Sequence, residues 1–248
     1  MADLLVDLGS SRLKWALADD ALGPVEAAAW KGRGLEALLD ARWGGMIPPA
    51  CVAASVVAPA PVKEALAEWV RARWRREVHF VSATQGWPGL ECAYADPARL
   101  GADRWAAMVA AHMRYPEGCL VVDCGTAVTL DALAGGRHLG GYILPGVQAM
   151  REAVLGETAV EVTEGVEIER WGWGDTTARC LELGIAGAVA ALVEASLERL
   201  QGEGVCDPTL VITGGQAGSI LPLIQVDYRR HDHLVLEGVR LCTRRTLE

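Results

Sequence analysis

LLVDLGSSRLKWAL, residues 4–17, is matched further along the chain by LVVDCGTAVTLDAL, residues 120–133. Each stretch is an apolar run, then Asp, any residue, Gly and a hydroxyl-bearing residue, then a second apolar-rich run. Short, continuously apolar runs rich in β-branched residues are typical of strands buried on both faces. The glycine after each aspartate permits a tight turn that a Cβ atom would hinder. The repeat therefore predicts two equivalent β-hairpins.

Two equivalent hairpins in one chain predict two similar lobes in tandem. We place the boundary near MRYPEGC, where Pro116 and Gly118 interrupt the helical pattern of DRWAAMVAAHM. The lobes are then residues 1–116 and 117–248. Strand-like and helix-like segments alternate throughout, which predicts the α/β class.

The remaining segments supply the other elements of each lobe. The first lobe is predicted to contain a strand at residues 50–57, an amphipathic helix at 61–76 and a strand at 77–83. The second lobe is predicted to contain a strand and turn at 140–146, a long helix at 178–200, a strand ending in Gly-Gly at 209–215, and a short closing segment at 233–241. The apolar face of the helix at 61–76 carries Val62, Leu66, Trp69, Val70 and Trp74.

Composition argues against several classes of protein. The net charge of −9 over 248 residues argues against a broad polyanion-binding surface, because Lys and Arg hold phosphate backbones. Seven scattered cysteines without a C-x-x-C pair argue against a disulfide framework and a zinc knuckle, and favour a reduced intracellular protein. No apolar stretch reaches the roughly 18 residues of a membrane helix, and Asp3 lies in the first strand-like run, where a signal peptide would be apolar.

Several weaker motifs were weighed against the hairpins. The chain has no Walker A loop, and GRGLEA at residues 32–37 matches a dinucleotide fingerprint only superficially, because the strand before it is weak. HDH at residues 231–233 is either a metal ligand pair or, as the spacing favours, a polar loop. WGWG at residues 171–174 is expected to cap a loop or an interface.

The hairpins carry the residue types that nucleotide phosphates require. Carboxylates hold hydrated Mg²⁺, and closely packed backbone N–H groups with hydroxyls hold phosphate oxygens. Asp7 and Asp123, with the glycines and hydroxyls that follow them, supply both kinds of group. ITGG at residues 212–215 would contact the nucleoside. We therefore expect two hairpins facing one triphosphate across a cleft between the lobes.

This set of motifs resembles that of the type III pantothenate kinases, within the acetate kinase, sugar kinase, Hsp70 and actin superfamily. The resemblance covers most of the chain and rests on five motifs in order: DLGSSRLKW, DPARLGADRWAAMVAA, VVDCGTAVTLD, GGYILPGVQAM and ITGGQA. Two departures stand out. Ser10 replaces the usual Asn of the first hairpin, and Thr176-Thr177 replaces the usual Asn-Thr.

The resemblance implies two tandem ribonuclease-H-like (actin-like ATPase) lobes, each a mixed β-sheet flanked by helices. It implies that the γ-phosphoryl group of ATP is transferred to the primary hydroxyl of pantothenate, the first step toward coenzyme A. Asp103 of GADR would be the general base, although an Asp at the start of an apolar helix is also a natural N-cap. Arg104 would hold the pantothenate carboxylate or order its loop.

The same resemblance implies the remaining site residues. The pantothenate pocket would comprise Tyr94, Gly101, Ala102, Asp103, Arg104 and Thr177. The ATP site would comprise Asp7, Leu8, Gly9, Ser10, Ser11, Arg12, Leu13, Lys14, Gly125, Thr126, Gly214 and Gly215. Asp7 would organise Mg²⁺ and Asp123 a monovalent cation, K⁺ or NH₄⁺. Lys14 would lie near the transferring phosphate, or else be a surface lysine.

The family also implies a homodimer, and the composition given above favours a cytoplasmic protein that binds neither nucleic acid nor membrane. The Ala/Gly-rich helix at 178–200 would permit close helix packing at the dimer interface. Two alternatives remain at this stage. One is a nucleotide-binding accessory factor for transcription without kinase activity, against which the intact acid of GADR and the lack of a basic groove speak. The other is a different small-molecule kinase or ATPase of the same superfamily.

Overall fold

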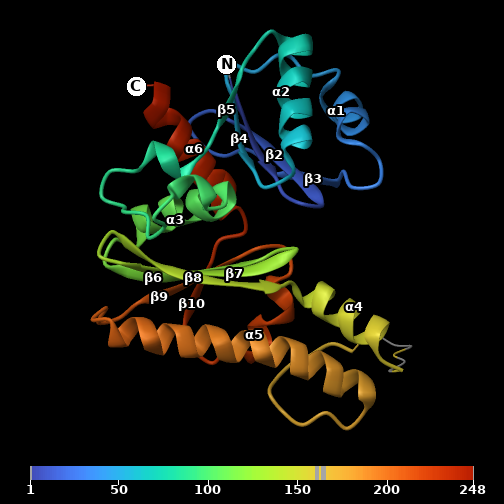
Figure 1. The fold of residues 1–248 in the computed structure, drawn as a ribbon, viewed down its shortest axis with the longest axis vertical. Coiled ribbons are helices and arrows are strands. Elements are labelled where there is room, and N and C mark those ends of the chain that lie inside the picture. Colours follow the sequence, from blue (N-terminus) through green and yellow to red (C-terminus); the bar gives the residue numbers. More distant parts are fainter. Residues whose placement is uncertain (1, 160–161, 163–165, 248) are drawn as a thin grey trace. The chain divides into compact units, whose positions relative to one another are not determined.

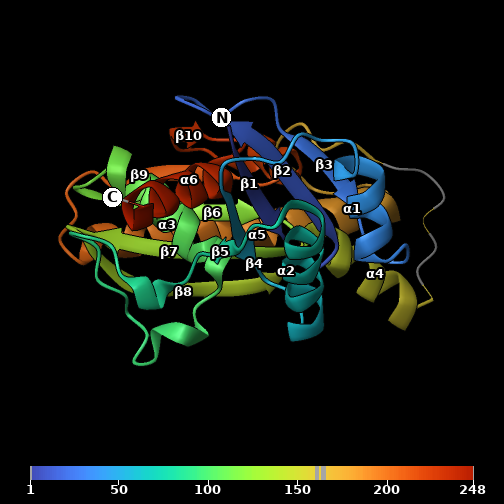
Figure 2. The same cartoon turned by 90° about the horizontal axis from the view of Figure 1, so that it is seen from above.

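The computed structural model describes residues 2–159, 162 and 166–247. It divides into two compact units, Met1–Met113 with His233–Glu248, and Arg114–Asp232. Each unit is built around one five-stranded mixed sheet (Figures 1 and 2).

The sheet of the first unit has the strand order β3-β2-β1-β4-β5. Strands β1 to β3 form an antiparallel meander, and β4 and β5 run parallel to β1. The β1–β2 hairpin is the one that the first repeat predicts. The strand bounds are β1 Asp3–Leu8, β2 Arg12–Ala18, β3 Glu26–Ala29, β4 Val52–Val56 and β5 Val78–Phe80.

The sheet of the second unit repeats this topology strand for strand, in the order β8-β7-β6-β9-β10. Strands β6 to β8 form the antiparallel meander, and β9 and β10 run parallel to β6. The predicted α/β fold of two ribonuclease-H-like sheets flanked by helices is therefore confirmed. The strand bounds are β6 Gly118–Cys124, β7 Ala127–Ala134, β8 Arg137–Pro145, β9 Thr209–Thr213 and β10 Tyr228–Arg230.

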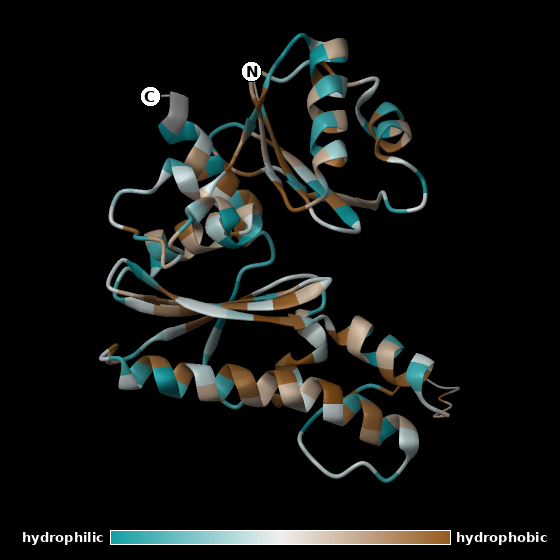
Figure 3. Ribbon diagram, in the orientation of Figure 1, coloured by the Kyte–Doolittle hydropathy of each residue, from teal (hydrophilic) through white to brown (hydrophobic). Residues whose placement is uncertain are grey.

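The core of the first unit lies between its sheet and two helices, α1 (Leu35–Trp43) and α2 (Ala60–Trp74). Side chains alternate across a strand, so Leu4, Val6 and Leu8 of β1 face these helices while Asp7 lies on the other face. Four indoles pack here with ring centroids 5.0–6.0 Å apart, namely Trp15, Trp43, Trp69 and Trp74. In Figure 3 hydrophilic and hydrophobic segments alternate along the α2 ribbon, as expected for a helix with one polar and one apolar face.

The other two helices of the first unit are α3 (Ala102–Arg114) and α6 (Leu234–Leu247). The sequence pattern suggested a short final segment belonging to the second lobe, whereas α6 has 14 residues and packs on β1 and β4. Leu234, Leu236 and Val239 of α6 are buried. The chain thus returns to its first unit, which local sequence pattern does not reveal because an amphipathic helix fits either sheet.

The second unit adds α4 (Val147–Glu157) and the long α5 (Thr177–Gly202). α5 runs along one face of its sheet (Figure 1) and buries residues such as Val189, Ala190 and Val193 against it. By length and composition alone it is apolar enough to cross a membrane, contrary to the expectation that no apolar stretch is long enough. Half of its most apolar window, however, is buried inside the protein. That burial is the behaviour of a core helix.

The weaker motifs have structural roles in the second unit. In WGWG, the Trp171 indole donates to the Leu223 carbonyl at 2.6 Å, and Gly174 packs closely on the start of α5. In HDH, His231 pairs with the Tyr115 hydroxyl at 2.9 Å and Asp232 with Arg230 at 2.7 Å. These contacts agree with a capping loop and a polar loop.

Candidate active site

The first hairpin places its acid and its lysine side by side. Asp7 at the end of β1 pairs in register with Lys14 of β2, and the Asp7 Oδ2 lies 3.7 Å from the Lys14 Nζ. Asp7 is only 8% exposed, whereas Lys14 is half-buried. Leu8 and Leu13 are fully buried, so they offer the turn only backbone groups. The turn between them, Gly9 to Arg12, is closed by the Gly9 N–H donating to the Arg12 carbonyl at 3.0 Å.

Ser55 is a polar residue beside this hairpin that the sequence motifs did not indicate. It pairs with Asp7 across the parallel strands β1 and β4, and paired residues of neighbouring strands point to the same face. The Ser55 hydroxyl is fully buried, and its Oγ has no hydrogen-bond partner among the residues that the structure describes. Buried hydroxyls nearly always have a partner, so Ser55 suits a water or ion held beside Asp7.

The second hairpin forms the corresponding turn between β6 and β7. The Gly125 N–H donates to the Ala127 carbonyl at 2.9 Å, so this turn is closed in the same way but is one residue shorter than the first. The Thr126 carbonyl accepts the Gly146 N–H at 3.0 Å, and a Cβ on Gly146 would lie 2.5 Å from that carbonyl oxygen. Gly146 is also the N-cap of α4, which has no acidic residue in its first turn. The Gln148 N–H in the first turn of α4 donates to the Gln216 Oε1 at 3.4 Å, and the N-terminus of a helix generally favours an anion nearby.

The Gly-Gly turn after β9 lies beside Asp123 because β6 and β9 are parallel neighbours. Gly214 has φ +96°, and a Cβ there would meet the Asp123 Oδ1 at 2.4 Å. The Gln216 N–H donates to the Cys124 carbonyl at 2.8 Å. One edge of the second sheet thus brings together Asp123, Gly125, Thr126, Gly214 and Gly215.

Cys124, at the end of β6 beside this turn, is an unreactive thiol. Burial, with a smaller effect from the negative charge of Asp123, raises the pKa of the Cys124 thiol to about 12. A thiol with that pKa stays protonated and neutral near pH 7. Cys124 therefore adds no charge to the phosphate turn.

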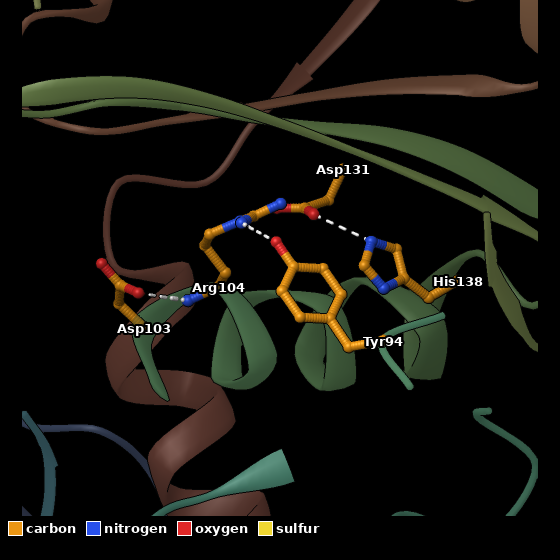
Figure 4. Close-up of polar contacts among 5 residues, drawn as sticks. All are labelled: Tyr94, Asp103, Arg104, Asp131 and His138. Atoms are coloured by element: carbon orange, nitrogen blue, oxygen red, sulfur yellow. Dashed lines mark hydrogen bonds and ion pairs between the residues drawn. The ribbon is translucent and has the colours of Figure 1, made fainter. Parts of the chain in front are cut away.

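The GADR segment, residues 101–104, forms the start of α3 in the first unit. Asp103 lies in the first turn of α3 rather than at the N-cap position, and its Oδ1 accepts the Arg104 N–H at 2.7 Å (Figure 4). A Cβ on Gly101 would lie 2.6 Å from that same oxygen. Glycine at position 101 therefore leaves the room that the Asp103 carboxylate occupies.

The side chains of Arg104 and Tyr94, both in the first unit, contact each other. The Arg104 Nη1 donates to the Tyr94 hydroxyl at 3.0 Å, and the guanidinium lies 5.9 Å from the centre of the Tyr94 ring (Figure 4). Arg104 is only 7% exposed. Of the two roles that the sequence leaves open for Arg104, this bond supports ordering of the loop that carries Tyr94.

A cavity of about 490 Å³ opens beside the substrate segment, between the ends of β4 and β5 and residues 98–102. Its lining includes Gly101 and Ala102 of GADR together with the cations Lys63 and Arg99. The volume is within the usual range for small-molecule pockets. An anionic ligand of modest size suits this lining.

The second unit contains a buried His–Asp pair, in which the His138 Nε2 lies 2.9 Å from the Asp131 Oδ1 (Figure 4).

The described residues can also be searched for metal ligands. Among the residues that the structure describes, no cluster of three or more His, Cys, Asp or Glu side chains could hold a metal ion. Mg²⁺ usually takes one or two carboxylates, waters and phosphate oxygens, so Asp7 beside the unsatisfied Ser55 hydroxyl fits a nucleotide-borne Mg²⁺.

The structure brings the predicted residues together in groups within each unit. The first unit holds the hairpin from Asp7 to Lys14 and the segment from Tyr94 to Arg104. The second unit holds the turns around Asp123 and Gly214. Thr177 is the exposed first residue of α5, and the Thr176 hydroxyl before it caps this helix by accepting the Arg179 N–H at 3.2 Å.

Solved structures share this fold at low sequence identity. A protein of Campylobacter jejuni assigned to the Baf family of transcriptional activators aligns with a TM-score of 0.64 and 19% identity, covering 98% of both chains. MreB5 of Spiroplasma citri, bound to AMPPNP, aligns with a TM-score of 0.54 and 13% identity, covering 99% of this chain and 97% of that one. These likenesses support the actin-like ATPase fold.

Sequence comparison is more specific. Residues 3–199 match the family model of type III pantothenate kinase. The type III pantothenate kinase of Nitrosospira multiformis is 36% identical over 246 residues, covering 99% of this chain and 92% of the relative. That of Nitrosococcus oceani is 35% identical, covering 95% and 91%. The chain belongs to the type III pantothenate kinase family.

Proposed function

We propose that this chain transfers the γ-phosphoryl group of ATP to the primary hydroxyl of pantothenate. One observation carries the proposal. The same Asp-x-Gly-hydroxyl turn stands at the same topological position of both sheets, and a positioned carboxylate, Asp103, starts a helix of the first unit. Family membership supplies the substrate, since the relatives named above are pantothenate kinases.

Each turn supplies backbone and hydroxyl groups of the kind that bind the phosphates of ATP. Residues 9–12 supply them in the first unit, and Gly125 and Thr126 with Gly214 and Gly215 supply them in the second. Asp7 holds the Mg²⁺ that accompanies the nucleotide, and this ion neutralises charge on the phosphates when bound. Lys14, 3.7 Å from Asp7, adds a positive charge near the transferring group.

Asp103 accepts the proton of the pantothenate hydroxyl. Phosphoryl transfer asks the protein mainly for alignment, charge neutralisation and a base for this proton. The Arg104 N–H fixes the orientation of the Asp103 carboxylate, and the helix N-terminus favours its negative charge. The cavity beside Gly101 and Ala102, with Lys63 and Arg99 in its lining, receives the substrate. Tyr94 and Thr177 are assigned to substrate binding on the strength of the family alone.

The test is ADP formation in the presence and absence of pantothenate. A pantothenate kinase makes ADP only when pantothenate is added, whereas an accessory factor makes none and a different kinase responds to another alcohol. Asp103→Asn keeps the size of the side chain and should lower kcat by about 10²-fold or more, the usual scale for a general base. Near-normal turnover with an unchanged melting temperature would remove Asp103 from the mechanism.

Asp123 is proposed to hold a monovalent cation in the second turn. Its half-buried carboxylate lies against the Gly214 backbone, and oxygen ligands of this kind suit K⁺ or NH₄⁺. Activity in sodium buffer should therefore rise when potassium or ammonium is added, and Asp123→Asn should abolish this response. Equal rates in sodium and potassium would refute the assignment.

We further propose a cytoplasmic homodimer, on the strength of the family. Trp173 of the WGWG loop is 96% exposed next to the start of α5, which suits burial against a second copy. Sedimentation velocity of the purified protein decides this point, because a fully active monomer would contradict it. The net charge of −9 argues against a general affinity for nucleic acid.

A further inference from the structure

Trp30 contacts the first phosphate turn twice, from a position that no motif marks. It follows β3, where Ala29 pairs with Arg12 of β2, so it lies opposite the turn. Its indole Nε1 donates to the Gly9 carbonyl at 2.9 Å, and its backbone N–H donates to the Ser11 carbonyl at 3.2 Å. The half-buried ring also packs against the apolar core of the first unit.

These two bonds determine where the donors of the turn point. In a trans peptide, the carbonyl of one residue and the N–H of the next point in opposite directions, and the described residues contain no cis peptide bond. Because Trp30 binds the Gly9 and Ser11 carbonyls, the N–H groups of Ser10 and Arg12 point away from Trp30. A turn whose carbonyls face one side thus presents backbone N–H groups on the other, as phosphate-binding turns do.

We propose that Trp30 is a positioning residue for ATP, which holds the peptide planes of the first turn in the orientation that binds phosphate. The inference rests on the proposed function, in which residues 9–12 hold nucleotide phosphates. It assigns Trp30 no contact with the nucleotide itself. The physical advantage is that the turn is ordered before ATP arrives, so binding does not have to supply that ordering free energy.

The test compares two tryptophans that each donate one indole hydrogen bond of 2.9 Å. Trp30→Phe keeps an aromatic ring but removes the bond to Gly9, and Trp69→Phe removes an equivalent bond to Asp40, away from the turn. The dissociation constant for ADP is measured by calorimetry. The KM values for ATP and pantothenate and the melting temperature are measured for each variant.

Loss of one such bond corresponds to about a fivefold change in an equilibrium constant. Trp30→Phe should therefore raise the ADP dissociation constant and the KM for ATP about fivefold, with the KM for pantothenate unchanged. Trp69→Phe should lower the melting temperature and leave both nucleotide constants at wild-type values. The different outcomes for the two variants distinguish a role of Trp30 in positioning the turn from a mere contribution to the stability of the fold.

Unchanged nucleotide constants in Trp30→Phe would overturn the inference, as would an equal rise in Trp69→Phe. If the wild type binds ADP but does not phosphorylate pantothenate, the proposed substrate is wrong, and the comparison of ADP dissociation constants still decides the role of Trp30. A wild type that binds no nucleotide overturns both proposals.

Discussion

Gly101 controls, at the scale of a single residue, where the Asp103 carboxylate can lie. Its φ is not in the left-handed region, so alanine is allowed there by the backbone. An added Cβ would nevertheless lie 2.6 Å from the Asp103 Oδ1 and would push the carboxylate away from the Arg104 N–H. We expect Gly101→Ala to lower kcat about 10-fold or more, because a small displacement of a catalytic group is costly.

Gly45→Ala is the matched control for this substitution. It lies in the same unit, and a Cβ there meets no atom within 4 Å. Both variants should melt within a few degrees of the wild type, while only Gly101→Ala loses turnover in the ADP assay. Equal kcat values for the two variants would show that the Asp103 carboxylate does not depend on Gly101.

Residues in local motifs could be predicted from the sequence, whereas residues that act through tertiary contacts could not. Asp7 and Asp123 stand in a repeated pattern, and the structure places each at a hairpin turn. Ser55 and Trp30 reach the first turn only through the pairing of β4 with β1 and of β3 with β2. No spacing rule along the chain connects Trp30 with Gly9, so this contact appears only once the sheet is formed.

At the scale of one element, α3 carries a histidine that makes the first unit sensitive to acid. Burial lowers the pKa of His112 below its ordinary value of 6.5, and its Nε2 lies beside Gly89 of the preceding loop. The unfolded chain therefore binds a proton more readily than the folded one as the pH falls below about 6.5. Stability rises with pH wherever the unfolded state binds more protons, so His112 costs stability in that acidic range.

In His112→Gln, the melting temperature should consequently fall less between pH 7 and pH 5 than it does in the wild type. Thermal unfolding followed by circular dichroism at both values measures this difference. The exposed His79 of β5 provides the control, because its replacement by Gln removes an exposed histidine and leaves the partly buried His112 in place. A pH dependence in His112→Gln equal to that of the wild type would contradict the role given to His112.

Helices and strands with a clear amphipathic or alternating sequence pattern were predicted correctly. Where each of them begins and ends depends on capping and packing contacts, which the sequence pattern does not show. The hairpins and α2 follow the expected ranges closely, since alternation and amphipathicity are local properties. α5 begins at Thr177 because the Thr176 hydroxyl caps it, and it continues to Gly202, beyond the predicted 178–200. The apolar composition of α5 does not say whether sheet or lipid covers it, and only the folded unit shows the sheet.

For the whole molecule, the return of α6 to the first unit means that the second unit is inserted into the first. The contact that fixes α6 is close, because a Cβ on Gly238 would lie 1.8 Å from the Ala106 carbonyl oxygen of α3. Overpacking of this kind costs about 1–3 kcal/mol, so Gly238→Ala should lower the free energy of unfolding by about that amount. Gly184→Ala, in the open part of α5, should instead raise it by up to about 1 kcal/mol.

Amide hydrogen exchange would show which unit responds to the loss of this contact. If α6 is part of the first unit, Gly238→Ala should speed exchange in β1 and β4, on which α6 packs, before it affects β6 and β7. The cluster of Trp15, Trp43, Trp69 and Trp74 lies only in the first unit, so its fluorescence should follow the same early transition. Faster exchange in β6 and β7 with β1 still protected would mean that α6 supports the second sheet instead, and the division of the chain at residue 233 would then be wrong.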